Sequence, residues 1–472
     1  MSRANIHRQI IAVALLIALP SFAAPAGGVR RRAATTPVNE WTKYCGTLSM
    51  TGDAAGERIL STDSVPRIAL LWSQKLKGAI ASAPSVARGK VYVGDWSGIE
   101  WALDTDTGAV IASADLGQTS NASCNPPLAG ITSSPLIDGG RVYLAGGDDG
   151  FYALDADTLI TIWRRSLGDN TPAGGYYGWS SPSLAGGKLL QGIASNCDNP
   201  FPRGALAAID PATGEVSNVT YFVPEDKTGG GVWTSAAVDV EHNKIFVTTG
   251  SAETFGVGNS YSIVRIDLAT MIIEDSWQLP LNPGVTPDAD WGSSPTLFTD
   301  AAGRELVGAG QKDGRYYAFD RNDLAAGPIW LAPIAVGGDV PQMGEGTLST
   351  AAFDGTTLYI GGGAPPDGDD PSRIGSVCAV RPDDGTILWR HTFDGPVLAP
   401  VSIANGVVFA VGGQSVVAFD AATGDVLWSF QMKSLGYGGV AISNGRAYVG
   451  DLSGTIYAFG LPGLIARPPG RR

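Results

Sequence analysis

Residues 133–163 read SSPLIDGGRVYLAGGDDGFYALDADTLITIW, and this stretch contains the pattern that decides the fold. Short apolar runs alternate with three turn signals, of which the first two are the glycine-rich stretches at 139–140 and 146–150. Short runs of β-branched, aromatic and aliphatic residues bounded by such turns are typical of strands. The stretch is therefore predicted to form four short strands.

The same pattern recurs eight times along the chain. Each copy begins with a short motif of small residues, such as Ser-Ser-Pro, and successive copies start 40 to 59 residues apart. The copies begin at Ser82, Ser133, Ser180, Thr234, Ser293, Ser349, Leu398 and Gly438. Four antiparallel strands repeated at this period predict an all-β, eight-bladed propeller.

The two ends of the repeat region support closure of the ring. The last unit, from Gly438 to Phe459, contains only three strands, while a lone fourth-strand sequence stands early in the chain at Ile68 to Trp72. We expect the early strand to complete the last blade and to cover an edge that would otherwise be open to aggregation. A parallel solenoid would give no reason to split one unit between both ends.

The composition agrees with a turn-rich β fold and excludes several other classes. Of 472 residues, 64 are Gly and only 16% are charged, which excludes a helical bundle or coiled coil. At 44% hydrophobic, the chain has enough apolar surface to fold. Its net charge of -13 argues against nucleic acid or anionic lipid as partners, and leaves cationic partners or metal ions open.

The N-terminal residues predict export. Arg3 and Arg8 precede an apolar run from Ile10 to Leu19, and small residues follow near Ala23, as in a secretory signal. The run is too short to span a membrane, so we expect no integral span and a periplasmic or secreted protein. The predicted regions are a signal peptide at 1–26, an N-terminal linker or extension at 27–66, the propeller at 67–460 and a basic tail at 461–472.

Four cysteines remain in the predicted mature chain. They form no C-x-x-C-H motif, so no covalently attached haem is expected. In an oxidising compartment disulfides are the default. Cys124 and Cys197 lie in loops rich in Gly, Pro and Asn and are the preferred pair, whereas Cys378 is either a buried thiol or a partner of Cys45.

The repeat itself resembles a known family. Residues 418–428 read AFDAATGDVLW, which is similar to the tryptophan-docking repeat of quinoprotein-type propellers, and the resemblance runs from about Trp72 to Phe459. The irregular loops resemble the polyvinyl alcohol dehydrogenase branch at 196–200, 229–235, 249–253, 288–295 and 310–314. The superfamily includes pyrroloquinoline quinone (PQQ) dehydrogenases and also scaffolds without catalytic activity.

This resemblance implies roles for individual loop residues. It places the catalytic base at Asp290, with Asp288 as its rival, and the cation that contacts the quinone oxygens at Lys312. The calcium ligands are expected at Asp198 and Glu253, where Glu253 is read as replacing an asparagine of the family. Three tryptophans are expected to contact the cofactor, with Trp233 as its floor and Trp179 and Trp291 at the rim.

The resemblance also implies a function, with one alternative. We expect an exported, PQQ- and calcium-dependent alcohol dehydrogenase-like enzyme that moves a hydride from a small or polymeric alcohol to the quinone and passes electrons to a separate cytochrome c or other acceptor. The adjacent Cys-Cys pair of methanol dehydrogenase-like enzymes is missing. The alternative is therefore a non-catalytic propeller that serves as a binding or assembly scaffold in the cell envelope.

Overall fold

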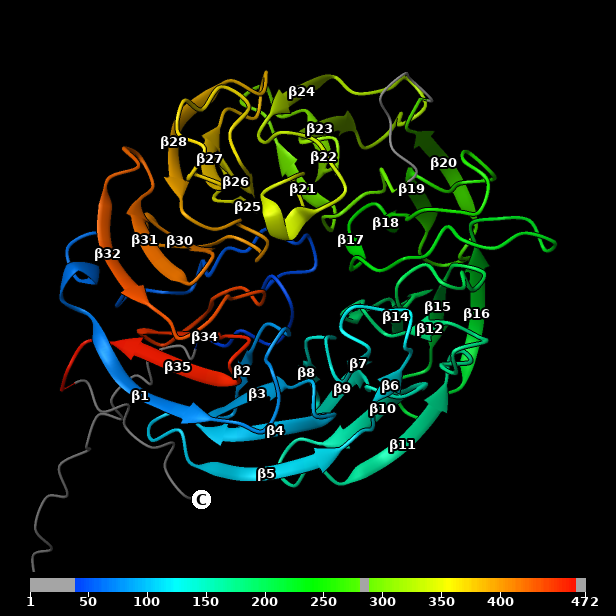
Figure 1. Cartoon of the computed structure of the whole chain (residues 1–472), viewed down its shortest axis with the longest axis horizontal. Helices are drawn as coiled ribbons and strands as arrows, with labels where there is room; N and C mark the ends of the chain where they lie inside the picture. The colour runs from blue at the N-terminus through cyan, green and yellow to red at the C-terminus, as the bar shows by residue number, and fades with distance from the viewer. Residues whose placement is uncertain (1–38, 281–287, 464–472) are drawn as a thin grey trace, which may run out of the picture. The chain divides into compact units, whose positions relative to one another are not determined.

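A computed structural model describes residues 39–280 and 288–463. The chain divides into two units, 1–37 and 38–472, and all described residues lie in the second. Besides one two-stranded sheet, these residues form eight larger antiparallel sheets that follow one another around a ring (Figure 1), so the predicted eight-bladed propeller is confirmed. The predicted signal peptide at 1–26 lies outside the described residues.

In blades 1 to 7, the four main strands follow chain order. Blade 1 contains β2 (Ser85–Ala87), β3 (Lys90–Gly94), β4 (Ile99–Asp104) and β5 (Val110–Asp115), and blade 2 contains β8 (Leu136–Asp138), β9 (Arg141–Ala145), β10 (Gly150–Asp155) and β11 (Thr161–Ser166). Blade 3 contains β13 (Ser183–Ala185), β14 (Lys188–Ser195), β15 (Ala205–Ile209) and β16 (Val216–Tyr221), and blade 4 contains β17 (Ala237–Asp239), β18 (Lys244–Thr248), β19 (Ser262–Asp267) and β20 (Ile273–Gln278). Blades 5 to 7 contain β21 (Thr296–Thr299), β22 (Glu305–Gly310), β23 (Arg315–Asp320), β24 (Trp330–Pro333); β25 (Ala352–Phe353), β26 (Leu358–Gly363), β27 (Gly375–Val380), β28 (Ile387–Phe393); and β29 (Ser402–Ala404), β30 (Val407–Gly412), β31 (Ser415–Asp420), β32 (Val426–Gln431). Blade 8 contains β33 (Ala441–Ser443), β34 (Arg446–Gly450), β35 (Thr455–Gly460) and the early strand β1 (Ala69–Lys75). The remaining elements are β6 (Thr119–Ser120), β7 (Leu128–Ala129), β12 (Tyr176–Tyr177) and the short 3-10 helices η1 (Val65–Arg67) and η2 (Pro341–Met343).

The ring closes as the sequence predicts. β1 pairs antiparallel with β35, from Ala69 opposite Gly460 to Lys75 opposite Thr455. The first strand of the repeat region therefore supplies the outermost strand of the last blade. The inner strands of each blade are covered on both faces by neighbouring blades, which explains why β10 is almost entirely buried while the outermost strand β11 is mostly exposed.

The repeated tryptophans join each blade to the next. Trp163 on β11 donates its indole N–H to the carbonyl of Pro211 at 3.2 Å, and its ring covers Gly214 in the Thr-Gly turn of the following blade. A Cβ atom at Gly214 would lie 2.6 Å from the ring of Trp163. The same contact is made by Trp72 on Gly108, Trp330 on Gly385 and Trp389 on Gly424. These tryptophans pack blades together and do not face the centre of the ring.

The motif that begins each repeat also has a structural reason. The second residue of the motif donates its backbone N–H to the hydroxyl of the corresponding residue in the next blade. The linked residues are, in order around the ring, Ala83, Ser134, Ser181, Ser235, Ser294 and Thr350, with N···O distances of 2.8 to 3.2 Å. Because these backbone groups lie at the crowded centre, a short side chain with an acceptor oxygen is needed there.

Residues 39–57, which fall in the predicted linker or extension, pair with the inner edges of the blades. The bonds run from the backbone N–H of Val86 to Trp41 O, Ile137 to Thr42 O, Val238 to Leu48 O, Leu297 to Ser49 O, Phe353 to Thr51 O, Ile403 to Gly52 O and Gly445 to Glu57 Oε2, at 2.7 to 2.9 Å. Figure 1 shows this dark blue segment inside the ring. We refer to residues 39–57 as the central segment. It covers strand edges that would otherwise lack partners.

Candidate active site in the central cavity

A cavity of about 540 Å³ lies among the inner ends of the blades. Its wall includes the aromatic residues Tyr44, Trp96, Trp179, Trp233 and Tyr437 and the charged residues Asp198, Asp288, Asp290, Lys312 and Asp339. The charged residues come from loops between the second and third strands or from loops that lead into a first strand. These two loop classes share one face of the propeller, which explains how residues far apart in sequence meet.

Lys312 binds two aspartates in the wall of this cavity. Its Nζ atom lies 2.7 Å from Oδ1 of Asp288 and 2.7 Å from Oδ1 of Asp290. Asp290 is almost completely buried, whereas the side chain of Asp288 is 42% exposed. Ser251 adds a hydroxyl that donates to Asp288 Oδ1 at 3.3 Å. The result is a lysine held between one buried and one accessible carboxylate.

Trp233 completes the environment of Asp290. Its indole N–H donates to Asp290 Oδ2 at 2.9 Å, and Lys312 Nζ lies 5.9 Å from the centre of a Trp233 ring. Oδ2 of Asp290 therefore accepts a hydrogen bond, whereas the buried Oδ1 accepts none and lies in ion-pair contact with Lys312. Because the indole is anchored through its N–H, its ring face is held in a fixed orientation in the cavity wall.

Gln311 connects the loops that carry these residues. Its side chain is fully buried, its amide N–H donates to Ala289 O, and its amide oxygen accepts the backbone N–H of Asp313. The backbone N–H of Lys312 also donates to Asp290 O at 3.3 Å. Sequence reasoning missed this function of Gln311, because a buried amide in a turn carries no recognisable pattern.

The charges in the cavity shift one another's ionisation. Burial raises the pKa of Asp290 to about 6, although the charge of Lys312 opposes the shift. Burial would lower the pKa of Lys312, but the charges of Asp290 and Asp288 hold it above its usual value. Burial raises the pKa of Asp198 to about 7, and repulsion by Asp290 and Asp288 adds to the shift. Such shifts are typical of sites that bind cations or move protons.

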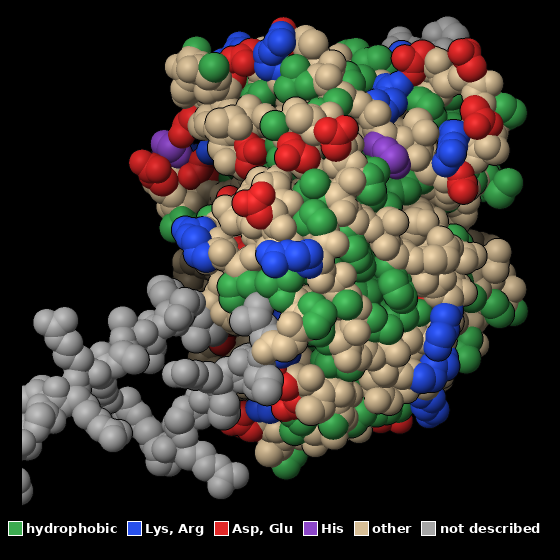
Figure 2. Space-filling view, turned by 90° about the vertical axis from the view of Figure 1, so that its left-hand side faces the viewer, with side chains coloured by type: hydrophobic (Ala, Val, Ile, Leu, Met, Phe, Trp, Pro, Cys, Tyr) green, Lys and Arg blue, Asp and Glu red, His purple; other side chains and the backbone are tan. Residues whose placement is uncertain are grey.

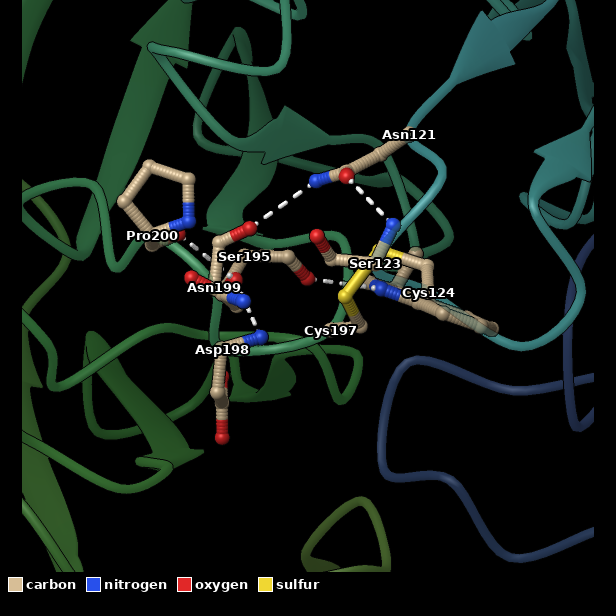
Figure 3. Close-up of a disulfide and its surroundings, with 9 residues drawn as sticks. Asn121, Ser123, Cys124, Ser195, Cys197, Asp198, Asn199 and Pro200 are labelled. Atoms are coloured by element: carbon tan, nitrogen blue, oxygen red, sulfur yellow. Dashed lines mark hydrogen bonds between the residues drawn. A yellow bond between two sulfur atoms is a disulfide. The ribbon is translucent and has the colours of Figure 1, made fainter.

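Asp198 reaches the cavity from the loop between β14 and β15. Figure 3 shows its carboxylate pointing away from the disulfide that lies next to it in the chain. That disulfide joins Cys124 and Cys197, the pair preferred from the sequence, with their Cα atoms 5.6 Å apart. Cys45 and Cys378 are buried free thiols, so the alternative bridge between them does not form.

The structure separates the predicted site residues into two groups. Asp198, Asp290, Lys312, Trp233 and Trp179 all line the cavity, and Trp179 is anchored by an indole hydrogen bond to Ser195 O at 2.8 Å. Glu253 and Trp291 do not line it. The side chain of Glu253 is exposed to solvent.

Two of the residues predicted from the sequence, Trp291 and Glu253, do not reach the cavity, and Ser251 reaches it in place of Glu253. Trp291 is fully buried in a core cluster against Trp277 and Tyr317. In the Thr249-Gly250-Ser251 stretch, the third residue reaches the cavity and Glu253, two residues later, does not. Counting from the Thr-Gly pair would have pointed to Ser251.

One other group of potential metal ligands lies among the described residues, formed by Asp239, His242 and Glu305. Arg321 already contacts Asp239 Oδ2 at 3.0 Å, and His242 Nδ1 contacts the same oxygen at 3.0 Å. We interpret this group as an ion-pair network between blades 4 and 5. On the side of the molecule in Figure 2, acidic and basic side chains are interspersed, and no broad basic patch suited to nucleic acid is seen.

An eight-bladed ring closed by its first strand, with acidic, basic and aromatic residues in a central cavity, is the architecture that the sequence resemblance predicts for a PQQ-like propeller. Comparison with known proteins agrees. The family model described as "Outer membrane protein assembly factor BamB" matches residues 69–325 and 312–462, and the chain belongs to this family of PQQ-like repeat propellers.

Individual relatives are named as dehydrogenases. The chain is 25% identical over 460 residues to a polyvinylalcohol dehydrogenase of Pseudomonas sp., covering 85% of this chain and 69% of the relative. It is 25% identical over 487 residues to the polyvinylalcohol dehydrogenase of Sphingopyxis sp. strain 113P3, covering 89% and 72%. Among solved structures, the quinohemoprotein alcohol dehydrogenase from Comamonas testosteroni has a similar fold, with a TM-score of 0.72, 19% identity and coverage of 92% and 82%. In the part of the chain that the structure describes, no helix is long and apolar enough to cross a membrane.

Proposed function

We propose that this protein is an exported, PQQ- and calcium-dependent alcohol dehydrogenase-like oxidoreductase. The observation that carries the proposal is the group formed by Asp290, Lys312 and Asp288 beside the ring of Trp233 in the cavity. The names of its relatives support an alcohol as substrate. Export is proposed from the signal-like sequence at 1–26.

The cavity residues fit a flat, anionic cofactor. Trp233 and Trp179 offer aromatic faces whose orientation is fixed by indole hydrogen bonds. Lys312 offers a buried ammonium group for oxygen atoms of a quinone. Bound PQQ would supply an ortho-quinone that accepts a hydride, which is chemistry that amino-acid side chains lack.

The cavity also offers the oxygen ligands that calcium requires. Calcium prefers carboxylate, carbonyl and hydroxyl oxygens. Asp198, Asp288 and Ser251 provide such atoms in the cavity wall, whereas Glu253 lies outside it. A divalent cation there would also offset the repulsion among the three aspartates, which is one cause of the raised pKa of Asp198. We therefore assign the metal to Asp198 with these neighbours.

Asp290 is the proposed base. With a pKa of about 6 it is mostly ionised at neutral pH and still accepts a proton readily. Its buried position excludes bulk water, and the Trp233 N–H holds Oδ2 so that Oδ1 is the oxygen that can exchange Lys312 for a substrate hydroxyl. Lys312 then provides positive charge near the oxygens that become negative. The electrons leave for a separate acceptor, such as a cytochrome c.

Reconstitution of the purified protein with PQQ and calcium tests the proposal. We expect saturable PQQ binding and reduction of an artificial dye with primary, secondary or polymeric alcohols. Asp290→Asn should retain PQQ binding within a few fold and reduce turnover by about 100-fold or more, the size of a lost general base. Asp288→Asn is the comparison variant, assayed at saturating calcium because Asp288 is also a proposed neighbour of the metal. A larger loss of turnover there than in Asp290→Asn, with calcium and PQQ bound, would make Asp288 the base.

One result would contradict the proposed dehydrogenase activity. If the wild-type protein neither binds PQQ nor reduces dye with any of the alcohols, the non-catalytic scaffold in the cell envelope is the better interpretation.

A further inference from the structure

A small hairpin contacts the loop that carries Asp198. The hairpin consists of β6, β7 and the connecting residues 121–127, and it lies between blades 1 and 2 in the chain. It is joined to the loop 195–200 of blade 3 at two points (Figure 3). One is the disulfide between Cys124 and Cys197, and the other is a hydrogen bond from Asn121 Nδ2 to Asn199 O at 2.9 Å.

Asn121 is built into this junction. Its side chain is nearly buried, and its Oδ1 accepts the backbone N–H of Ser123 at 3.0 Å while its Nδ2 reaches across to the other loop. Its backbone N–H donates to Pro127 O and its carbonyl accepts the N–H of Cys124. The residue therefore shapes the hairpin turn and bonds to the blade 3 loop at the same time.

The two points of attachment flank Asp198. Cys197 precedes it and Asn199 follows it in the chain. Asp198 itself has a φ of +59°, a conformation that costs free energy for a residue with a side chain and needs support from its surroundings. Its backbone N–H donates to Ser195 Oγ at 2.6 Å.

The carboxylate of Asp198 also faces electrostatic repulsion from Asp290 and Asp288. Attraction to Lys312 offsets part of this repulsion, and without a bound metal ion the remaining repulsion favours movement of the loop away from the cavity. The disulfide and the Asn121 hydrogen bond oppose that movement from either side of Asp198. A loop held in this way loses less conformational entropy when a cation binds.

We propose that Asn121 is a positioning residue that, together with the Cys124–Cys197 disulfide, holds the Asp198 carboxylate in the cavity for metal binding. The proposal rests on the proposed function, in which Asp198 is a metal ligand. It predicts that metal affinity falls when either attachment is removed, although neither touches the metal. Residues that support a ligand in this way typically contribute about 10- to 100-fold in affinity.

Terbium(III) is the probe for this test, because it can replace calcium and its luminescence is sensitised by nearby tryptophans such as Trp179 and Trp233. Asn121→Asp keeps the shape of the side chain but removes the amide donor, and Asn121→Ala does so without adding charge. We expect each to weaken terbium binding by about 10-fold or more. Addition of a thiol reductant to the wild-type protein should weaken it in the same direction.

The matched control is Asn170→Asp. Asn170 also bonds to the hairpin, through Nδ2 to Thr119 Oγ1 at 3.1 Å, but this bond is made to β6 and not to the loop that carries Asp198. We expect its affinity for terbium to stay within about twofold of wild type. Equal losses at Asn121 and Asn170 would overturn the proposal, because they would show a general effect of the hairpin.

Hydrogen exchange of the metal-free protein tests the positioning role of Asn121 separately from the proposed metal site. Peptides that cover residues 195–200 should exchange faster in both Asn121 variants than in Asn170→Asp. Unchanged exchange would overturn the positioning role, whatever the metal affinity. If exchange is faster but wild-type protein binds neither terbium nor PQQ, the proposed function fails and the metal role of the loop is rejected with it.

Discussion

Asp290 combines deep burial with contacts to one cation and one indole N–H. Burial alone would favour the protonated carboxyl group, whereas an ion pair with Lys312 in solvent would favour the carboxylate and make it a weak base. The position of its pKa near 6 reflects the balance between burial, which raises it, and Lys312, which lowers it.

This balance predicts a pH-dependent stability. The folded-state pKa of Asp290 is raised from 3.8 to about 6, so its contribution to stability is fully present below about pH 4 and is lost as the pH rises through 6. Asp290→Asn cannot titrate. The melting temperature of the metal-free variant relative to wild type should therefore rise between about pH 4 and 7.

Thermal unfolding of both proteins across this pH range provides the measurement. Asp198→Asn extends the comparison. Because the folded-state pKa of Asp198 is about 7, the pH range over which wild type loses stability relative to this variant ends at a higher pH. A difference between wild type and Asp290→Asn that does not change with pH would contradict the raised pKa.

At the residue scale, loops with a recognisable order of residues predicted several of the residues that line the cavity. Lys312 lies in a Gly-Gln-Lys-Asp-Gly turn, and Asp290 directly precedes a Trp-Gly-Ser-Ser-Pro segment. Trp291 was wrongly placed at the rim, because spacing does not reveal which of two neighbouring residues faces the core. The ion pairs of Lys312 with Asp288 and Asp290 could not be predicted either, because they depend on side-chain conformations that residue spacing does not determine.

At the element scale, the contact between blades depends on glycine in the Thr-Gly turn. Gly214 has a φ of +72°, and its position under the ring of Trp163 leaves no room for a methyl group. Gly214 is therefore required for two reasons: its positive φ is unfavourable for other residues, and a Cβ atom would collide with the ring of Trp163.

These two reasons can be separated by experiment. Gly187 in the same blade has a φ of +73°, and no atom lies within 4 Å of the place that a Cβ would take there, so Gly187→Ala reports the backbone cost alone, about 1 kcal/mol. Gly214→Ala should cost about 1–3 kcal/mol more, because the methyl group must displace the tryptophan. Urea unfolding of both variants checks this, and equal midpoints would show that the blade contact adjusts freely.

The strands were predictable because every blade repeats the same turn chemistry. The hairpin of β6 and β7 and the extra strand β12 were not, because they belong to loops that occur once and carry no repeated signal. The hairpin contacts the Asp198 loop, and its connecting residues Asn125 and Pro126 line the cavity, while β12 pairs with β14 just before that loop. A repeat pattern therefore predicts the scaffold better than the site.

At the scale of the whole molecule, the central segment connects blades that are distant in sequence. Glu57 shows this most clearly. Its buried carboxylate accepts the backbone N–H of Gly445 at 2.9 Å and also the N–H groups of Arg58, Ile59 and Leu60. One side chain thus fixes the end of the central segment to blade 8.

Glu57→Ala should therefore destabilise the protein by about 2–4 kcal/mol, because several buried N–H groups lose their acceptor. The exposed Glu225 offers a control, for which Glu225→Ala should change stability by less than about 0.5 kcal/mol. Chemical denaturation monitored by tryptophan fluorescence measures both. A loss at Glu57 no larger than at Glu225 would mean that the segment contributes little to the ring.

The sequence predicted closure by β1 but not the path of the central segment. Closure could be predicted because the sequence of one repeat is split between the two ends of the repeat region. The central segment pairs through backbone groups supplied by blades from one end of the chain to the other, so its own side chains need no regular pattern. Backbone pairing of this kind cannot be read from residue types.

The central segment also constrains the order of folding. Its partners extend from Val86 to Gly445, so the earliest described residues cannot complete their contacts until nearly the whole chain has been synthesised. Contacts across so many residues carry a large loop-closure entropy and form slowly. We therefore expect the blades to form first and the central segment to enter last, so that assembly of the finished ring is the slow step on the folding pathway.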